Sequence, residues 1–263
     1  MTLALVKQER LWYTDAMKVL LSFSKRMLFG MLLLPLLCLL CCMPQEDAIN
    51  DENAVQTEKG EEAHPIIFPV YSSAGMVSEA SFFQACSSEH AMVYVSAHAV
   101  KAESAQELLE AFEETIFPAM SEPTILEDKR LSILISFMEG NVYGYMPSEL
   151  QDGEQGPVVY LNALFVDDLS YALAHEYQHL CAYDASKAGD TVISEETDEL
   201  LSDMFTELLF PCYGQEHGIL SEERTLAAQE RIEAWGEDAL SHAYDLMRSG
   251  YSEKELLSTL ENR

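Results

Sequence analysis

The sequence predicts a single α+β domain that follows an N-terminal targeting segment. Segments with the composition of strands lie mainly in the first part of this domain, and segments with helical periodicity fill its second part. Strands first and helices afterwards are typical of α+β domains. The 263 residues suit one sizeable core or two small ones, and 48% hydrophobic with 23% charged residues is an ordinary globular composition.

The N-terminal segment has the pattern of a secretory signal. Two lysines and an arginine precede residues 27–44, a leucine-rich stretch without a charged side chain. Leu39-Leu40-Cys41-Cys42 resembles a bacterial lipobox, with Cys42 as the residue that would carry the lipid. We therefore expect residues 1–41 to be a lipoprotein-type signal peptide. The alternative is a signal anchor that stays in the membrane, because the apolar run is nearly long enough to span it.

An acidic tether is expected between this signal and the folded domain. Residues 45–63 hold seven acidic residues, one lysine and few apolar side chains. Such a segment cannot bury enough apolar surface to fold. The predicted organisation is a signal peptide at 1–41, a disordered tether at 42–63 and a folded domain at 64–263.

The first half of the domain is predicted to hold four strands and one helix. The helix covers residues 103–117, where Leu108, Leu109, Phe112 and Ile116 form one apolar stripe, and Pro118 ends it. Residues 139–157 are rich in turn residues and should form an exposed loop. The strands are expected at residues 65–71, 91–97, 131–137 and 158–161.

The second half is predicted to be helical. One helix should run from about Ser170 to Asp184, and another from about Glu196 to Phe210, where Pro211 ends it. Residues 221–262 indicate two or three further helices, with breaks near Gly236 and Gly250.

The first of these helices carries the sequence HEYQH at residues 175–179. His175 and His179 are four residues apart, so they project from one face of a helix and can bind one zinc ion together. Glu176 lies beside the position left open on the metal, where it can take a proton from the attacking water. This motif predicts a zinc-dependent hydrolase of the metallopeptidase type.

A catalytic zinc site needs a third protein ligand, and the following helix offers several acids. Glu199 is preferred, because it lies twenty residues past His179 and inside the helix rather than at its start. Glu195 and Glu196 stay open as alternatives. Asp203 lies one turn beyond Glu199 on the same face, so we expect it to accept a hydrogen bond from His175.

The pairing of HEYQH with DELLSD at 198–203 resembles the gluzincin metallopeptidases, and more closely the hyicolysin-like neutral zinc metallopeptidases. Two further segments match that family in order and spacing, AFEETIFP at 111–118 and Gly144-Tyr145-Met146, so the resemblance covers roughly residues 103–205. Where the family usually has asparagine before the glutamate, this chain has Asp198.

The resemblance implies a zincin-like metallopeptidase domain, in which an N-terminal mixed or antiparallel sheet is followed by the active-site helix and a helical C-terminal part. It also implies one Zn²⁺ ion and a peptide or protein substrate that pairs with an edge strand above the zinc. That strand would be 131–137 or 158–161, and the loop 139–157, with Tyr143 and Tyr145, would border the specificity pocket.

An additional donor should stabilise the oxyanion during peptide hydrolysis. His217, Tyr213, His242 and Tyr244 are the candidates downstream. We prefer His242 and Tyr244, because both lie on a late helix that could fold back over the cleft.

The charge and the cysteine content limit which partners, metal sites and disulfides are possible. The 45 acidic and 15 basic residues give a net charge of −30, which repels nucleic acids, so no nucleic-acid partner is expected. Cys86, Cys181 and Cys212 show neither metal-ligand spacing nor an even-numbered disulfide framework. An acidic surface could favour cationic peptides, although a solvated surface is the plainer interpretation.

The sequence as a whole favours a zinc-dependent endopeptidase of the bacterial cell envelope. Lipid on Cys42 would attach it to a membrane, facing the periplasm or the exterior. The alternative is a non-catalytic zinc-binding envelope lipoprotein that binds a protein partner, but zinc retention alone would not require Glu176. A third possibility is hydrolysis of a non-peptide amide by the same residues.

Overall fold

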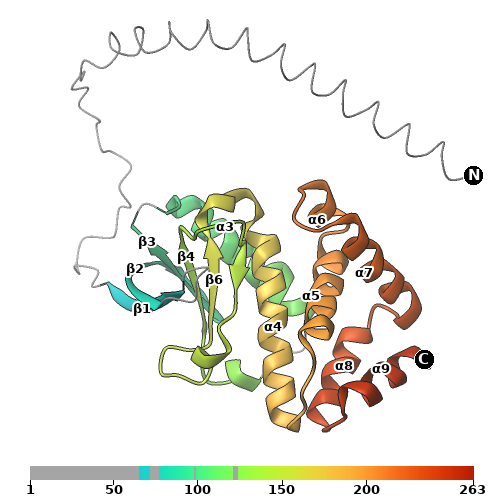
Figure 1. The fold of residues 1–263 in the computed structure, drawn as a ribbon. Helices are drawn as coiled ribbons and strands as arrows, with labels where there is room; N and C mark the ends of the chain where they lie inside the picture. Colours follow the sequence, from blue (N-terminus) through green and yellow to red (C-terminus); the bar gives the residue numbers. More distant parts are fainter. Residues whose placement is uncertain (1–64, 72–76, 98, 121–123) are drawn as a thin grey trace, which may run out of the picture. The chain divides into compact units, whose positions relative to one another are not determined.

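The computed structural model describes residues 65–71, 77–97, 99–120 and 124–263 (Figure 1). The expected signal peptide, Cys42 and the expected tether lie outside these residues. Within the described part of the chain, no helix combines the length and the apolar character that crossing a membrane requires.

A six-stranded mixed sheet forms the first half of the domain, in the order β1-β2-β3-β4-β6-β5. β3, β4 and β6 pair in parallel, and the remaining neighbours are antiparallel. All four predicted strands are confirmed, whereas β2 and β5 were not predicted. The strands are β1 (Ile66–Tyr71), β2 (Val77–Ser87), β3 (Ala91–Ser96), β4 (Leu131–Ser136), β5 (Gly144–Tyr145) and β6 (Val158–Asn162).

The predicted helices are also confirmed. The first continues beyond α3 through a π turn at Phe112–Ile116 and a 3-10 turn that contains Pro118. The C-terminal segment forms three helices, with left-handed glycines at the two expected breaks, Gly236 and Gly250. The helices are α3 (Ala102–Ala111), α4 (Leu169–Gly189), α5 (Glu195–Leu209), α6 (Tyr213–Glu216), α7 (Glu222–Trp235), α8 (Ala239–Arg248) and α9 (Glu253–Glu261).

The sheet carries apolar side chains on both faces. Along β4, Ile133 and Ile135 point into the main core, which includes α3 and α4, and Leu134 points to the opposite face. There it joins a smaller cluster with Phe82 and Tyr160. Burial on both faces explains why β4 and β6 are buried along their whole length. The fold is mixed α and β and is compatible with the predicted α+β class.

Helix α4 lies between the sheet and the C-terminal helices (Figure 1). It packs against β6 and β5 on one side and against α5 and α8 on the other. Thirteen of its 21 residues are buried, so it is a core helix with only a narrow accessible strip.

The edge of the sheet beside α4 corrects two expectations. β4 and β6 are interior strands, so neither is the edge strand, and β5 takes that place. β5 belongs to the segment 139–157, which was expected to be an exposed loop throughout. That segment also contains the fully buried Gln151, whose amide donates to the carbonyl oxygens of Pro147 and Val158.

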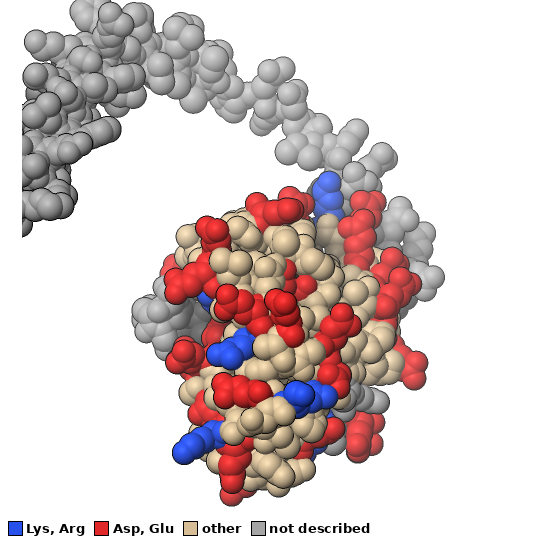
Figure 2. Space-filling model, turned by 90° about the vertical axis from the view of Figure 1, so that its right-hand side faces the viewer, with Lys and Arg blue, Asp and Glu red and all other residues tan. Residues whose placement is uncertain are grey.

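Figure 2 shows the face on the right-hand side of Figure 1. Asp and Glu side chains are spread over this face, with fewer Lys and Arg side chains among them. The acidic balance of the composition is therefore visible on the surface of the described residues.

Candidate metal centre

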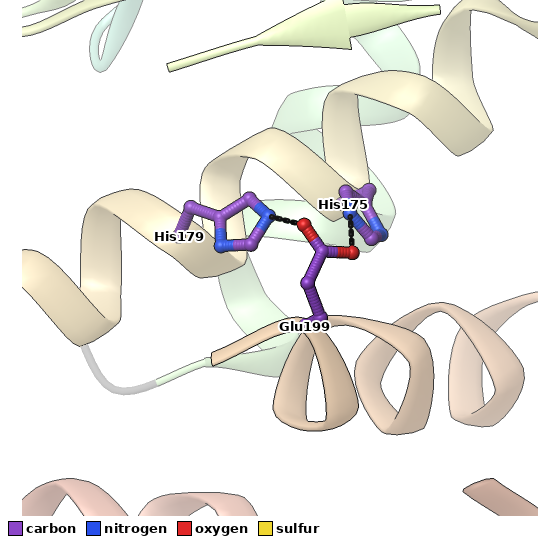
Figure 3. A group of neighbouring side chains, drawn as sticks. All are labelled: His175, His179 and Glu199. Carbon is purple, nitrogen blue, oxygen red and sulfur yellow. Dashed lines mark ion pairs between the residues drawn. The ribbon is translucent and has the colours of Figure 1, made fainter. Parts of the chain in front are cut away.

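Helix α4 presents both histidines of HEYQH on its accessible strip. His175 and His179 are one turn apart, and their ring centroids are separated by 4.8 Å. Their side chains are 17% and 12% exposed. Two imidazoles on a rigid, buried helix are thus held side by side at the surface of the core (Figure 3).

Helix α5 brings Glu199 against both rings. Ser194 caps this helix by accepting a hydrogen bond from the backbone of Thr197, which fixes where the helix begins. Glu199 lies within the second turn, with one carboxylate oxygen 3.5 Å from His175 Nε2 and the other 3.6 Å from His179 Nε2 (Figure 3). One ligand atom from each of the three residues can be chosen so that all lie within 4.8 Å of one another.

This arrangement distinguishes between the acids that the sequence left open. Glu195 and Glu196 are exposed at the start of α5, and neither belongs to the group of potential metal ligands found among the described residues. Glu199 is therefore the acid that the fold places with the two histidines.

The spacing of the donors fits a zinc ion. Zinc binds imidazole nitrogen and carboxylate oxygen at about 2.0–2.2 Å, so two ligands of a tetrahedral site lie about 3.4 Å apart. The nitrogen–oxygen distances of 3.5 and 3.6 Å run to the two different oxygens of Glu199, and each is close to that separation. Two imidazoles and one carboxylate also match the donor set of catalytic zinc sites that keep one position open.

Each histidine directs its other ring nitrogen toward an acid. His179 Nδ1 lies 2.8 Å from Asp198, a hydrogen bond that leaves Nε2 facing Glu199. Burial works against the charged ring, but Asp198 and the neighbouring carboxylates raise the pKa of His179 to about 9. Asp203 lies near His175 as expected, but its oxygen is 3.8 Å from Nδ1, longer than a hydrogen bond.

Arg224 holds the carboxylates of α5 in place from α7. It donates to both oxygens of Asp203, at 2.7 and 2.8 Å, and to one oxygen of Glu199 at 2.7 Å. The contact with His175, the two histidine charges and Arg224 lower the pKa of Glu199 to about 2. A carboxylate that stays ionised is the form that binds a metal.

Glu176 is buried between α4 and the edge strand. Only 6% of the residue is exposed, and burial raises the pKa of its carboxyl group although the two histidines oppose this. β5 approaches it closely at Gly144, where a Cβ atom would lie 2.9 Å from Glu176 Cγ and 3.1 Å from Oε1. Only glycine fits this position without displacing the carboxylate or the strand.

Tyr244, one of the two preferred oxyanion donors, lies in the core. Tyr244 is 1% exposed, and its hydroxyl accepts a hydrogen bond from Gln178 inside the core. The expectation for Tyr244 is wrong because α8 packs against α4 and buries this side chain in the core. His242 lies in the first turn of α8, and no hydrogen bond or ion pair joins it to the three ligands within the described part of the chain.

The other two candidates form a separate cluster at the start of α4. His217 Nδ1 lies 2.9 Å from Asp168, and Tyr213 donates to the same carboxylate at 3.0 Å. The two rings stack with centroids 3.8 Å apart. Asp168 precedes His175 by seven residues, about 10 Å along the helix, so this cluster does not contact the ligands directly.

Three residues at the site were not predicted in these roles: Asp198, Arg224 and Gly144. For Asp198 the sequence held a signal, because it occupies the position where the resembled family has asparagine. For Arg224 there was none, since it lies on a different helix 25 residues after Glu199.

The described site thus combines two imidazoles, a carboxylate between them and a buried carboxyl group beside an edge strand. A scan against protein-family models finds no match for the chain, and a search of the curated proteins finds no significant match.

Proposed function

We propose that this chain is a zinc-dependent endopeptidase. The observation that carries the proposal is the grouping of His175, His179 and Glu199 at metal-ligand spacing, one residue from the buried Glu176. When bound, zinc would supply a Lewis acid that acidifies water and polarises a carbonyl group. The finer fold assignment, a zincin-like metallopeptidase domain, belongs to this proposal.

Glu176 is the general acid–base in this proposal. Its carboxylate takes a proton from the attacking water and later delivers a proton to the leaving amine. Burial raises the pKa of its carboxyl group above the ordinary value, and a raised pKa favours the return of the proton to the leaving amine. Asp198 holds His179 through Nδ1, so that Nε2 stays directed at the metal position.

β5 provides a place for an extended peptide. β5 is the terminal strand of the described sheet, and a substrate strand can add to a terminal strand through backbone hydrogen bonds. Gly144 lies on this strand in contact with Glu176, so a peptide paired along β5 would pass directly by the proposed base. This arrangement favours peptide substrates over small non-peptide amides.

The proposed setting is the bacterial cell envelope. It rests on the signal-like residues 1–41 and on Cys42, the expected site of lipid attachment. The resemblance to the hyicolysin-like neutral metallopeptidases agrees with a secreted or lipid-anchored enzyme.

The test compares zinc content and casein cleavage for the purified full chain, Glu176→Gln and, as matched control, Glu195→Gln. We expect one equivalent of zinc in all three proteins, cleavage by the native chain and the control, and a loss of at least a hundredfold in Glu176→Gln. One equivalent of zinc without cleavage by the native chain would contradict the peptidase proposal and favour the non-catalytic zinc-binding lipoprotein.

A further inference from the structure

A pocket of about 260 Å³ opens beside the candidate metal centre, on the His179 side. Its polar end includes His179 and Asp198. Four apolar side chains form much of its wall, and they come from three segments: the residue after β5, helix α4 and the linker between α4 and α5. These side chains are Met146, Ala182, Val192 and Ile193.

The size and the exposed apolar wall of this pocket suit a side chain. A cavity of about 150 Å³ already holds a benzene ring, so 260 Å³ accommodates leucine, methionine or phenylalanine. Val192 is 84% exposed, more than any other large hydrophobic residue among those described. One exposed valine is ordinary by itself, but here it borders a pocket that runs to a potential metal ligand.

The acid in the pocket does not offer a site for a cation. Asp198 uses one carboxylate oxygen for the hydrogen bond to His179. Its other oxygen is buried and inaccessible to solvent. The accessible oxygen of Asp198 already pairs with His179, so a lysine or arginine side chain that entered the pocket would have to compete with that histidine, and the apolar wall would desolvate its charge.

β5 connects this pocket to the proposed base. Gly144 contacts Glu176, and Met146, two residues further along the chain, lines the pocket. Two residues of extended chain span about 7 Å. A peptide that pairs with β5, with its reacting carbonyl near Glu176, thus places the side chain of a residue one or two positions away at the pocket.

We propose that this pocket is a specificity subsite that binds an apolar side chain, of the size of Leu, Met or Phe, on a residue within two positions of the cleaved bond. This inference rests on the proposed peptidase function. It assigns specificity to the linker between α4 and α5 and to Met146.

The test is a peptide-mixture digest with cleavage sites identified by mass spectrometry. The full chain should prefer Leu, Met or Phe over Gly or Asp about tenfold or more at one position near the cut. Val192→Glu should reduce that preference about tenfold and raise cleavage of peptides with Lys at the same position. Leu164→Glu is the control, because Leu164 is also exposed, at 59%, and does not line the pocket.

A binding measurement separates the pocket from the chemistry. Two fluorescent peptide libraries, one with Leu and one with Asp at a single fixed position and otherwise identical, are titrated into zinc-loaded Glu176→Gln, with and without Val192→Glu. If the Leu peptides bind more tightly than the Asp peptides, and Val192→Glu removes this difference, the pocket is supported. This holds even if no cleavage is observed, and the peptidase proposal alone then fails. Cleavage without side-chain preference, or a preference unchanged by Val192→Glu, would overturn the pocket and leave the peptidase proposal standing.

Discussion

Asp198 offers a sharp test of how this site is held together. Its carboxylate lies 2.8 Å from His179 Nδ1, and its second oxygen has no hydrogen-bond partner in the described structure. Asp198→Ala therefore removes the shorter of two contacts to this nitrogen and leaves the Ser202 hydroxyl, which lies 3.2 Å from it. Asp198→Asn keeps an acceptor oxygen for the same nitrogen and removes only the negative charge.

The expected loss of zinc affinity follows from the contact between Asp198 and His179. Removing an acid that supports a metal-binding histidine typically weakens metal affinity about 10- to 100-fold, which corresponds to about 1.4–2.7 kcal/mol. We expect Asp198→Ala to reach this range and Asp198→Asn to lose less, because the hydrogen bond persists without its charge. Asp198 also lies in the first turn of α5, so its loss should cost the helix only about 0.3–1 kcal/mol in stability.

Zinc affinity is measured by competition with a chromophoric chelator at pH 7.5, and circular dichroism checks that the variants are folded. Glu196→Gln is the matched control, an exposed acid in the same helical turn, and its zinc affinity should be unchanged. A zinc affinity of Asp198→Ala within threefold of this control would refute the argument that Asp198 orients a metal ligand.

Three further predictions concern the surroundings of the site. Gly144→Ala should lower kcat/KM about 10- to 100-fold while one equivalent of zinc stays bound, because the added Cβ would lie 2.9 Å from both Glu176 Cγ and the Tyr160 carbonyl oxygen. An unchanged kcat/KM would contradict the close approach of β5 to Glu176. Arg224→Met should lower the free energy of unfolding by about 2–3 kcal/mol in urea denaturation, because it leaves the carboxylate of Asp203, whose side chain is 4% exposed, without its partner. The control is Arg231→Met on the same helix, where the arginine is equally exposed, and it should cost less than about 1 kcal/mol. Hydrogen bonds from Ser194 and Thr197 lower the pKa of Glu253 below its ordinary value of 4.5. Glu253→Gln should therefore lower the free energy of unfolding by about 1 kcal/mol at pH 7, and this difference from the native chain should disappear as the pH falls below 4.5. A difference that grows in acid would contradict the lowered pKa.

The elements that the sequence predicted are those with strong periodicity. β4 and β6 are mostly apolar because both of their faces are buried, and the helix predicted at 103–117 has a clear apolar stripe, although its helical turns continue past Pro118. β2 was missed because a single one of its eleven residues, Phe82, is buried, so its sequence shows no alternation. β5 is two residues long, too short to give a pattern, and it exists because β6 is available to pair with it.

At the candidate site too, the residues that the sequence predicted are those fixed by local spacing. The two histidines are fixed by helical spacing within one element, and Glu199 by its depth in the next helix. Tyr244 was misplaced because periodicity shows which face of α8 is buried and not which helix covers it. Arg224 acts across two helices, and no spacing rule links it to Asp203.

The proposed function depends on His175, His179 and Glu199 holding one zinc ion together. X-ray absorption at the zinc edge, recorded on the zinc-loaded full chain, tests it most directly. We expect one equivalent of zinc with two imidazole nitrogens and oxygen neighbours at about 2.0–2.2 Å, and loss of the bound zinc in Glu199→Ala. A sulfur neighbour at about 2.3 Å, or zinc retained unchanged in Glu199→Ala, would contradict it.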